Sequence, residues 1–296
     1  MLTKRLNLPL AALAASIVCT MPAAATQTAC PDKFAGGLAP DLLNPKLAPR
    51  TAPLCFSAFA VLHSGLVRSA LWSAEHLTRD SLRRAKETSR VNQFHAEPQL
   101  PAADRSELSD YERSGYDRGH LAPSGDMPDP VAQGESFSLS NMVPQDRDNN
   151  RGLWEGIESA TRTLATRSGE LFVVTGPIFH GSDVKALRGR VLVPTHLFKA
   201  IYDPRSGQAG AYLVGNVPGM RWKAISIAEL AGLSGVDPFP ALPASVKAVV
   251  PSLPEPTPHG FNRGGAEASA AGPAGGTVGY LEKNALWIAK KVLRAW

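Results

Sequence analysis

The sequence predicts an α+β fold in which helices flank a central, largely antiparallel sheet. Runs rich in β-branched, aromatic and small apolar residues recur along the chain and read as strands. Few helices separate them, and parallel strands would need long crossover connections, usually helical. The proposed strands lie in residues 56–77, 136–145, 170–179, 189–203 and 210–217.

The N-terminus has the pattern of a signal peptide at residues 1–25. Lys4 and Arg5 form a basic start, residues 9–19 are apolar but too few to span a bilayer, and Ala23–Ala25 offers small residues for cleavage. Removing the two cations lowers the formal charge from +5 to +3. We therefore expect a periplasmic or secreted protein, and its basic balance suits an anionic partner as well as plain solubility.

The mature chain begins with a Pro-rich segment, residues 26–52, and contains two cysteines, Cys30 and Cys55. An exported protein folds where disulfides form, so we expect these two to pair. With no CxxC pair present, a zinc ribbon is excluded.

The main domain is expected at residues 53–250. Within it, residues 56–77 predict two strands joined by a turn at Ser64–Gly65. Residues 78–110 are polar and are interpreted as a long surface segment, and the strand at 136–145 is expected to end at Pro144.

The composition changes after Pro251. Residues 251–279 are rich in Pro, Gly and Ala and predict a linker, and residues 280–296 have apolar positions at helical spacing. This amphipathic helix suits a membrane surface or a partner, docking on its own domain, or a free tail. No run after the signal peptide reaches the ~18 apolar residues of a membrane span.

A helical pattern covers residues 149–169. On a regular helix Asn150 falls within the apolar stripe and Glu158 at the margin of the same face. An inward amide needs a partner, because burying it unpaired costs about 1–3 kcal/mol. Asn150 either caps the helix or, with Glu158, supplies oxygen ligands to a hard cation such as Mg²⁺.

Arg118 and His120 lie two residues apart in a short segment that does not look like core. On a strand, both side chains would point to one face. A histidine is a candidate general base, and an arginine beside it can stabilise negative charge. This combination suits phosphodiester cleavage.

Three motifs in order carry a family resemblance. The runs YDRGHLAP (116–123), FSLSNMVPQ (137–145) and NNRGLWEGIE (149–158) resemble the DNA/RNA non-specific endonucleases of the ββα-metal group. That family includes secreted bacterial nucleases and mitochondrial endonuclease G. The similarity covers about residues 50–250. It implies that 53–250 is an endonuclease domain with a ββα-metal finger as its active site.

The resemblance implies a role for each matched residue. His120 would be the general base that activates water, and Asn150 would be the direct Mg²⁺ ligand, with Mn²⁺ able to substitute. Glu158 would hold the ion through bound water, while Arg118 and Asn141 would support the site and the scissile phosphate. The family also has an arginine upstream of an aromatic residue. Here Arg90 matches best, with Arg84 as the alternative.

The predicted function is therefore a metal-dependent endonuclease that hydrolyses DNA and RNA without sequence or sugar specificity. Contacts to phosphate carry no sequence information, which fits this breadth. One alternative is a nucleic-acid-binding protein with an inactive site. Another is a different metal-dependent phosphoesterase or a zinc hydrolase, although the sequence has no HExxH motif.

Overall fold

The computed structural model describes residues 28–257. The predicted signal peptide, most of the predicted linker and the helix predicted at 280–296 therefore lie outside the described residues. Its centre is a seven-stranded sheet with the order β12-β11-β10-β7-β4-β3-β2, in which every neighbouring pair is antiparallel. This confirms the predicted fold class. The strands are β2 (Thr51–Cys55), β3 (Phe59–Ser64), β4 (Ser69–Thr78), β7 (Glu170–Ile178), β10 (His196–Asp203), β11 (Gln208–Gly215) and β12 (Trp222–Ile225).

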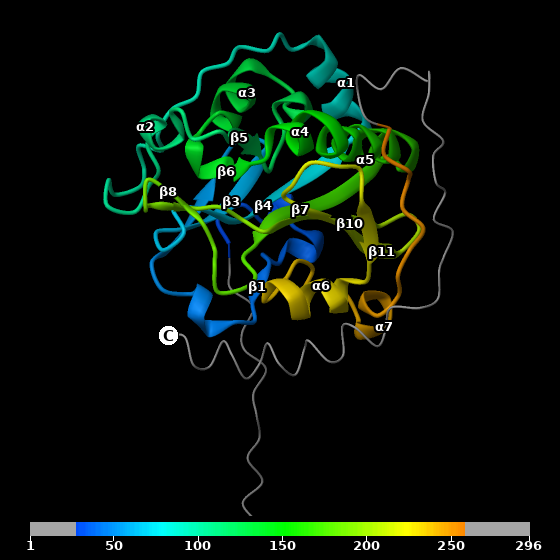
Figure 1. Cartoon of the computed structure of the whole chain (residues 1–296). Coiled ribbons are helices and arrows are strands. Elements are labelled where there is room, and N and C mark those ends of the chain that lie inside the picture. The colour runs from blue at the N-terminus through cyan, green and yellow to red at the C-terminus, as the bar shows by residue number, and fades with distance from the viewer. Residues whose placement is uncertain (1–27, 258–296) are drawn as a thin grey trace, which may run out of the picture.

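Helices cover both faces of this sheet (Figure 1). In the figure, α1, α3, α4 and α5 lie above the sheet and α6 and α7 below it. Within the described residues, no helix is long and apolar enough to cross a membrane. The helices are α1 (Arg79–Glu87), α2 (Leu108–Tyr111), α3 (Pro130–Ser136), α4 (Arg147–Asn149), α5 (Glu155–Ser168), α6 (Ile227–Ser234) and α7 (Ala244–Lys247).

Three two-stranded ribbons, each antiparallel, complete the fold of residues 28–257. One joins the N-terminal segment to the region after α6, one carries the motif that contains His120, and one forms a hairpin at the surface. They are β1 (Asp41–Leu42) with β13 (Val236–Asp237), β5 (Asp117–His120) with β6 (Met142–Gln145), and β8 (Ala186–Leu187) with β9 (Val191–Leu192).

Side chains alternate between the two faces of the sheet along each strand, so the sheet has one apolar cluster on each face. In β10, Leu197 and Ile201 belong to the cluster beneath α5, whereas Phe198 and Ala200 belong to the cluster beneath α6. This follows from the period of two along a strand, which sends neighbouring side chains to opposite faces. A sheet covered on both faces needs apolar residues at both sets of positions, which explains the nearly continuous apolar runs in the sequence.

The N-terminal segment is fastened to the sheet by the predicted disulfide. Cys30 and Cys55 are bonded, and their Cα atoms lie 6.1 Å apart. Cys55 is the last residue of edge strand β2, and the partner lies 25 residues earlier in the sequence. The bond therefore holds a segment with little regular structure against the rim of the domain.

Loss of this disulfide is expected to lower the free energy of unfolding by about 3 kcal/mol, because the open chain regains the entropy of a loop of this length. Urea unfolding with and without a reductant measures the change. The double variant Cys30→Ser/Cys55→Ser should start at the reduced value and ignore the reductant. Equal midpoints for oxidised and reduced wild type would contradict the prediction.

Part of the segment predicted as surface loop, residues 78–110, is helix α1. The Thr78 hydroxyl accepts a hydrogen bond from the backbone N–H of Ser81, and the backbone N–H of Thr78 donates one to the Ser81 hydroxyl. Together these bonds form a capping box at the helix start. Leu82 is buried beneath the helix. The many charged residues of this segment obscured its short amphipathic pattern in the sequence.

The strand predicted at 136–145 is shorter than expected. Residues up to Ser136 belong to α3, Leu139–Asn141 form a 3₁₀ turn, and only Met142–Gln145 are extended. Pro144 does not end the strand but lies within it. A ribbon of two strands leaves one side of each strand without a ladder partner, so a residue without an N–H is tolerated there.

The domain also extends past residue 250. Leu253 packs against the core beneath α5, and the Tyr212 hydroxyl donates a hydrogen bond to the Pro254 carbonyl at 2.7 Å. The first residues of the predicted linker therefore lie along β11 as part of the folded domain.

Candidate active site

The motif around His120 forms a finger of two strands and a helix on the face of the sheet opposite α6 (Figure 1). β5 and β6 pair antiparallel, with Arg118 opposite Pro144 and His120 opposite Met142. The chain then enters α4, a π-helical turn at Asn150–Trp154 and α5 without leaving helical geometry. The finger thus brings the first and third sequence motifs side by side.

Gly119 allows this ribbon to close on the helix. A Cβ atom at this position would collide with the Gln145 side chain, including its Cβ. Gln145 in turn donates a hydrogen bond from Nε2 to Asn149 Oδ1 at 2.9 Å, which joins β6 to the start of the helix. The glycine between Arg118 and His120 is therefore required by packing.

Gly119→Ala is expected to destabilise the protein by about 1–3 kcal/mol, because overpacking forces the ribbon and Gln145 apart. Gly134→Ala is the matched control, since this glycine lies within α3 with nothing near the added Cβ. The control should be neutral or stabilising by up to about 1 kcal/mol. Thermal unfolding compares the two, and equal stability would remove the packing argument.

His120 lies in an aromatic enclosure. Its ring centroid is 5.8 Å from that of Phe94 and 5.0 Å from that of Phe137. Nε2 is buried and makes no hydrogen bond with any residue that the structure describes. Burial, with a smaller contribution from the nearby charge of Arg90, lowers the pKa of His120 to about 3. The imidazole is therefore neutral near pH 7 and has a nitrogen free to take up a proton.

Two of the predicted arginines lie against the same aromatic rings. The guanidinium carbon of Arg118 is 4.1 Å from the Phe94 ring centroid, and that of Arg90 is 5.4 Å from the Phe137 centroid. Arg84 instead pairs with Asp80 at 3.4 Å along α1. Of the two upstream candidates, Arg90 is thus the one placed beside the neighbours of His120.

Asn150 is held by Asp117, the residue three before His120. Its Nδ2 donates to Asp117 Oδ2 at 3.0 Å, while its Oδ1 accepts no hydrogen bond from the described residues. Arg151 also binds Asp117, from Nε at 2.8 Å. Burial alone would raise the pKa of Asp117, but the hydrogen bonds from Arg151 and Asn150 outweigh it and lower that pKa.

The geometry corrects the regular-helix picture of Asn150. The π turn at Asn150–Trp154 changes the phase of the helix, so the amide lies half-buried against Asp117 rather than in the centre of the apolar stripe. Trp154, the last residue of this turn, is buried. A π turn of this kind often marks a functional position in a helix.

Glu158 lies half-buried on α5, one turn beyond the π segment. Burial raises the pKa of Glu158 to about 7, although the positive charges of Lys199 and Arg162 oppose the shift. Arg162 is itself anchored to Asp126 at 3.0 Å. The carboxyl group therefore changes its protonation state near neutral pH.

The structure reveals two buried ionisable residues beneath the finger, Glu75 and Lys199, to which the sequence alone assigned no role. Lys199 is buried in β10 and donates to Thr175 Oγ1 at 2.7 Å and, more weakly, to the Leu121 carbonyl at 3.4 Å. Glu75 is buried in β4, and burial and the charge of Asp126 raise its pKa well above the usual range. In the sequence, each is a single ionisable residue within an apolar run. Such residues are seldom fully buried in proteins unless they have a partner.

Asn141 is fully buried behind His120. Its Oδ1 accepts from the Ser73 hydroxyl at 2.7 Å and from the Ala122 backbone at 3.0 Å. Its Nδ2 donates to the carbonyls of Ala122 and Ser136 at 2.9 and 3.0 Å. The amide is fully used by the protein, so its side chain braces the loop after β5 and has no group left for a phosphate.

The donor chemistry fits a hard divalent cation. Asn150 offers a carbonyl oxygen without a partner among the described residues, and Glu158 offers a carboxylate on the same helix. Within residues 28–257, no three His, Cys, Asp or Glu side chains gather as a metal centre. One protein oxygen with water in the other positions is the arrangement that Mg²⁺ accepts.

An antiparallel sheet carrying a two-strand-and-helix finger, with a partly buried histidine on its ribbon and an asparagine at the start of its helix, is typical of the class of ββα nucleases. The chain belongs to the DNA/RNA non-specific endonuclease family, whose sequence profile matches residues 41–245. This confirms the predicted family.

Known relatives agree with this assignment. The chain is 38% identical to nuclease C1 of Cunninghamella echinulata over 52% of its own length and 66% of the relative. It is 34% identical to a nuclease of Nostoc, over 65% of this chain and 74% of the relative. With human mitochondrial nuclease EXOG it shares 32% identity over 65% of this chain and 58% of the relative.

A solved structure shares the fold. A crystal structure of the EndoG/EndoGI complex aligns with a TM-score of 0.55 and 26% identity, covering 63% of this chain and 86% of that one. The matched region thus spans nearly all of the solved chain but only about two thirds or less of nuclease C1 and EXOG.

Proposed function

We propose that this protein is a metal-dependent endonuclease that hydrolyses phosphodiester bonds in DNA and RNA without sequence or sugar specificity. The observation that carries the proposal is that one finger holds both a neutral, partly buried His120 and an Asn150 whose carbonyl oxygen accepts no hydrogen bond from the described residues. The family membership and its printed description support the same activity.

In this proposal His120 is the general base. A water molecule gives up a proton to the imidazole as its oxygen attacks phosphorus, and the bond from phosphorus to the leaving oxygen breaks. The low pKa of His120 keeps the accepting nitrogen unprotonated beforehand. Arg118 and Arg90 stabilise the negative charge that develops on the phosphate oxygens. Asn141 acts as a positioning residue that holds the loop behind His120.

Asn150 would hold the cation directly, and Glu158 would hold it through bound water. We propose Mg²⁺ as the resident ion, with Mn²⁺ as a substitute, because both accept oxygen ligands. When bound, the ion supplies charge stabilisation to the phosphate and to the leaving oxygen. Asp117 fixes the Asn150 amide by accepting a hydrogen bond from its Nδ2. This leaves Oδ1 as the atom that would ligate the ion.

The proposed breadth of substrate follows from the kind of contact. Arginines and a metal ion recognise the phosphate, which is the same for every base and for both sugars. The basic balance of the chain adds general attraction to nucleic acid. Nothing in the site arrangement described above depends on a base or on a 2′-hydroxyl group.

A cleavage assay tests this function directly. Plasmid, single-stranded DNA and RNA are each incubated with the protein and Mg²⁺, Mn²⁺ or EDTA. We expect all three substrates to be cut with either metal and none with EDTA. Binding without cleavage under every condition would favour the alternative, a nucleic-acid-binding protein with an inactive site.

The pKa of Glu158 sets a pH dependence. Glu158 can hold metal-bound water only as a carboxylate, and burial raises its pKa to about 7. Activity at fixed Mg²⁺ should therefore rise as the pH increases through about 7, and extra Mg²⁺ should move the rise to lower pH. In Glu158→Gln the rise near 7 should disappear together with most of the activity; a profile like that of wild type would exclude Glu158 as its source.

We also propose a periplasmic or secreted location. The disulfide between Cys30 and Cys55 supports an oxidising compartment. Fractionation of expressing cells, followed by detection of the protein in the periplasm or the medium, tests the location. Retention of the protein in the cytoplasm with free thiols would overturn it.

A further inference from the structure

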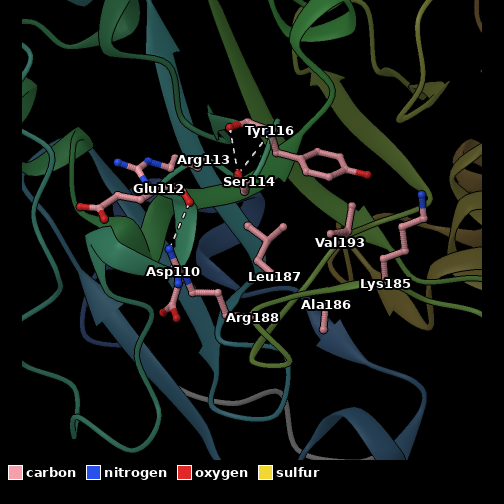
Figure 2. A pocket seen from close by; sticks show the side chains of 10 residues that line it. All are labelled: Asp110, Glu112, Arg113, Ser114, Tyr116, Lys185, Ala186, Leu187, Arg188 and Val193. Atoms are coloured by element: carbon pink, nitrogen blue, oxygen red, sulfur yellow. Dashed lines mark hydrogen bonds between the residues drawn. The ribbon is translucent and has the colours of Figure 1, made fainter.

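A pocket of about 460 Å³ lies beside the finger, outside the site described above (Figure 2). One wall comes from the loop between α2 and β5, and the other from the β8–β9 hairpin and the residues flanking it. It is lined by Asp110, Glu112, Arg113, Ser114, Tyr116 and residues 185–188 and 193.

The pocket carries an excess of positive charge. Arg113, Lys185 and Arg188 are exposed and line it. Of the two lining carboxylates, Asp110 is buried and already paired with Arg190 at 3.0 Å. Glu112 therefore remains as the one lining carboxylate without an ion pair in the described part of the chain. Such a surface attracts an anion.

One wall of the pocket is aromatic and apolar. Tyr116 packs at the edge of a small buried cluster that includes Leu187 and Val193. In Figure 2 its ring extends across the pocket toward the side where Lys185 lies, away from Arg113 and Glu112. A flat aromatic surface beside a cation is what a nucleotide needs, because the base stacks and the phosphate pairs.

This pocket lies near the candidate active site, to which it is linked through packed side chains. Tyr116 directly precedes β5, so strand alternation places it on the same side as Arg118 and His120. Phe94 links them, since it packs in the cluster with Tyr116 and also lies against the Arg118 guanidinium. From Tyr116 to His120 the strand advances by roughly 13 Å, at about 3.3 Å per residue. A single strand held at His120 would reach the pocket within a few nucleotides.

We propose that this pocket is a subsite for an unpaired nucleotide of the substrate strand, a few positions from the bond that is cut. An unstacked base lies on the Tyr116 ring, and Lys185 binds the phosphate on that side. Arg188, which lies on the opposite side of the pocket in Figure 2, binds a second phosphate of the strand. The inference rests on the proposed nuclease function and deepens it. It predicts that single-stranded segments gain a contact that a closed duplex, with its bases stacked on each other, does not make.

Binding of labelled oligonucleotides in EDTA tests the subsite without cleavage. Fluorescence anisotropy with full-length protein compares a single-stranded oligonucleotide with a blunt duplex of the same sequence. We expect Tyr116→Leu to weaken single-strand binding at least about fivefold and duplex binding less than about twofold. Tyr116→Phe keeps the ring and should bind like wild type, which separates lost stacking from a disturbed fold.

The cations are tested by the double variant Lys185→Gln/Arg188→Gln. Losing two phosphate contacts should reduce the slope of log affinity against log salt by about 1.4, at about 0.7 per contact on a single strand. Lys223→Gln is the matched control, because Lys223 is exposed on β12, at the edge of the sheet opposite β2. Its slope should match that of wild type.

Two outcomes would overturn the inference while leaving the nuclease function intact. One is that Tyr116→Leu binds single strands with the affinity of wild type. The other is that the double variant keeps the wild-type slope of log affinity against log salt. In both cases the wild-type protein would still cut plasmid in Mg²⁺. If the wild-type protein cut no substrate with any metal, the proposed function itself would fail. The cleavage assay thus separates the two failures.

Discussion

His120→Ala is expected to lower kcat by about 10²–10⁴-fold while substrate binding stays close to that of wild type. The range is that of a positioned general base, because the variant removes the proton acceptor and leaves the metal ligand and the arginines in place. Single-turnover cleavage of a labelled duplex in Mg²⁺ measures the chemical step. Anisotropy in EDTA measures binding.

His76→Ala is the matched control. His76 pairs with Glu170 at 2.7 Å and stacks on Phe172, which packs with the cluster beneath α6, on the other face of the sheet. Its replacement should leave kcat within about twofold. If His120→Ala cut at the wild-type rate, another group would have to serve as the base.

The partial burial of His120 makes this variant informative. Phe94 and Phe137 enclose the ring, so an alanine leaves space into which a small external base can diffuse. Imidazole added to His120→Ala should restore part of the activity if proton transfer is what was lost. The same addition should do nothing for a variant that has lost the metal ligand.

The overall architecture follows from sequence features that are local. Alternating and apolar runs identified most strands, because each strand needs only its own side-chain pattern to lie on a covered sheet. The helix that carries Glu158 could be predicted from the helical spacing of its apolar residues. It ends at Gly169, whose φ of 103° is a backbone conformation that suits glycine. The order of the three motifs gave the family.

The polar layer beneath the finger was not predictable in the same way. Lys199 meets Thr175 and the Leu121 carbonyl, which lie 24 and 78 residues away in the sequence. Only the register of β10 against β7 brings Lys199 opposite Thr175. The register of two strands that are distant in sequence cannot be predicted from one sequence. The hydrogen-bond partner of Lys199 could therefore not be predicted either.

Asn141 illustrates how a motif residue can be found without its role. Its place within the second motif marked it, but its partners Ser73 and Ala122 come from β4 and from the loop after β5. Four hydrogen bonds turn the amide inward, which assigns it to the frame of the site. The π turn at Asn150 is a similar case, since regular periodicity cannot reveal a local change of helical phase.

Asn150→Ala is expected to reduce metal-dependent cleavage by more than about 100-fold, and added Mg²⁺ should not restore it. In the proposed site Asn150 is the one direct protein ligand, so the variant leaves an ion held by water and by the outer carboxylate alone. Removing a residue that only hydrogen-bonds to a metal ligand typically lowers metal affinity or activity about 10–100-fold, and loss of the ligand itself should lower them further. A titration with Mg²⁺ and then Mn²⁺ measures both the rate and the apparent affinity for metal.

Two further variants locate the effect at the amide oxygen. Asp117→Ala leaves Asn150 in place but removes the acceptor for its Nδ2, so the amide can rotate and the apparent affinity for metal should fall about 10–100-fold with activity recovered at high Mg²⁺. Asn44→Ala alters an asparagine that caps a 3₁₀ turn in the N-terminal segment and should leave the titration unchanged. Asp117→Ala and Asn150→Ala should therefore respond differently to added Mg²⁺, because a higher metal concentration compensates for a loosely held ligand but not for a missing one. Recovery of Asn150→Ala at high Mg²⁺ would place the direct ligand elsewhere.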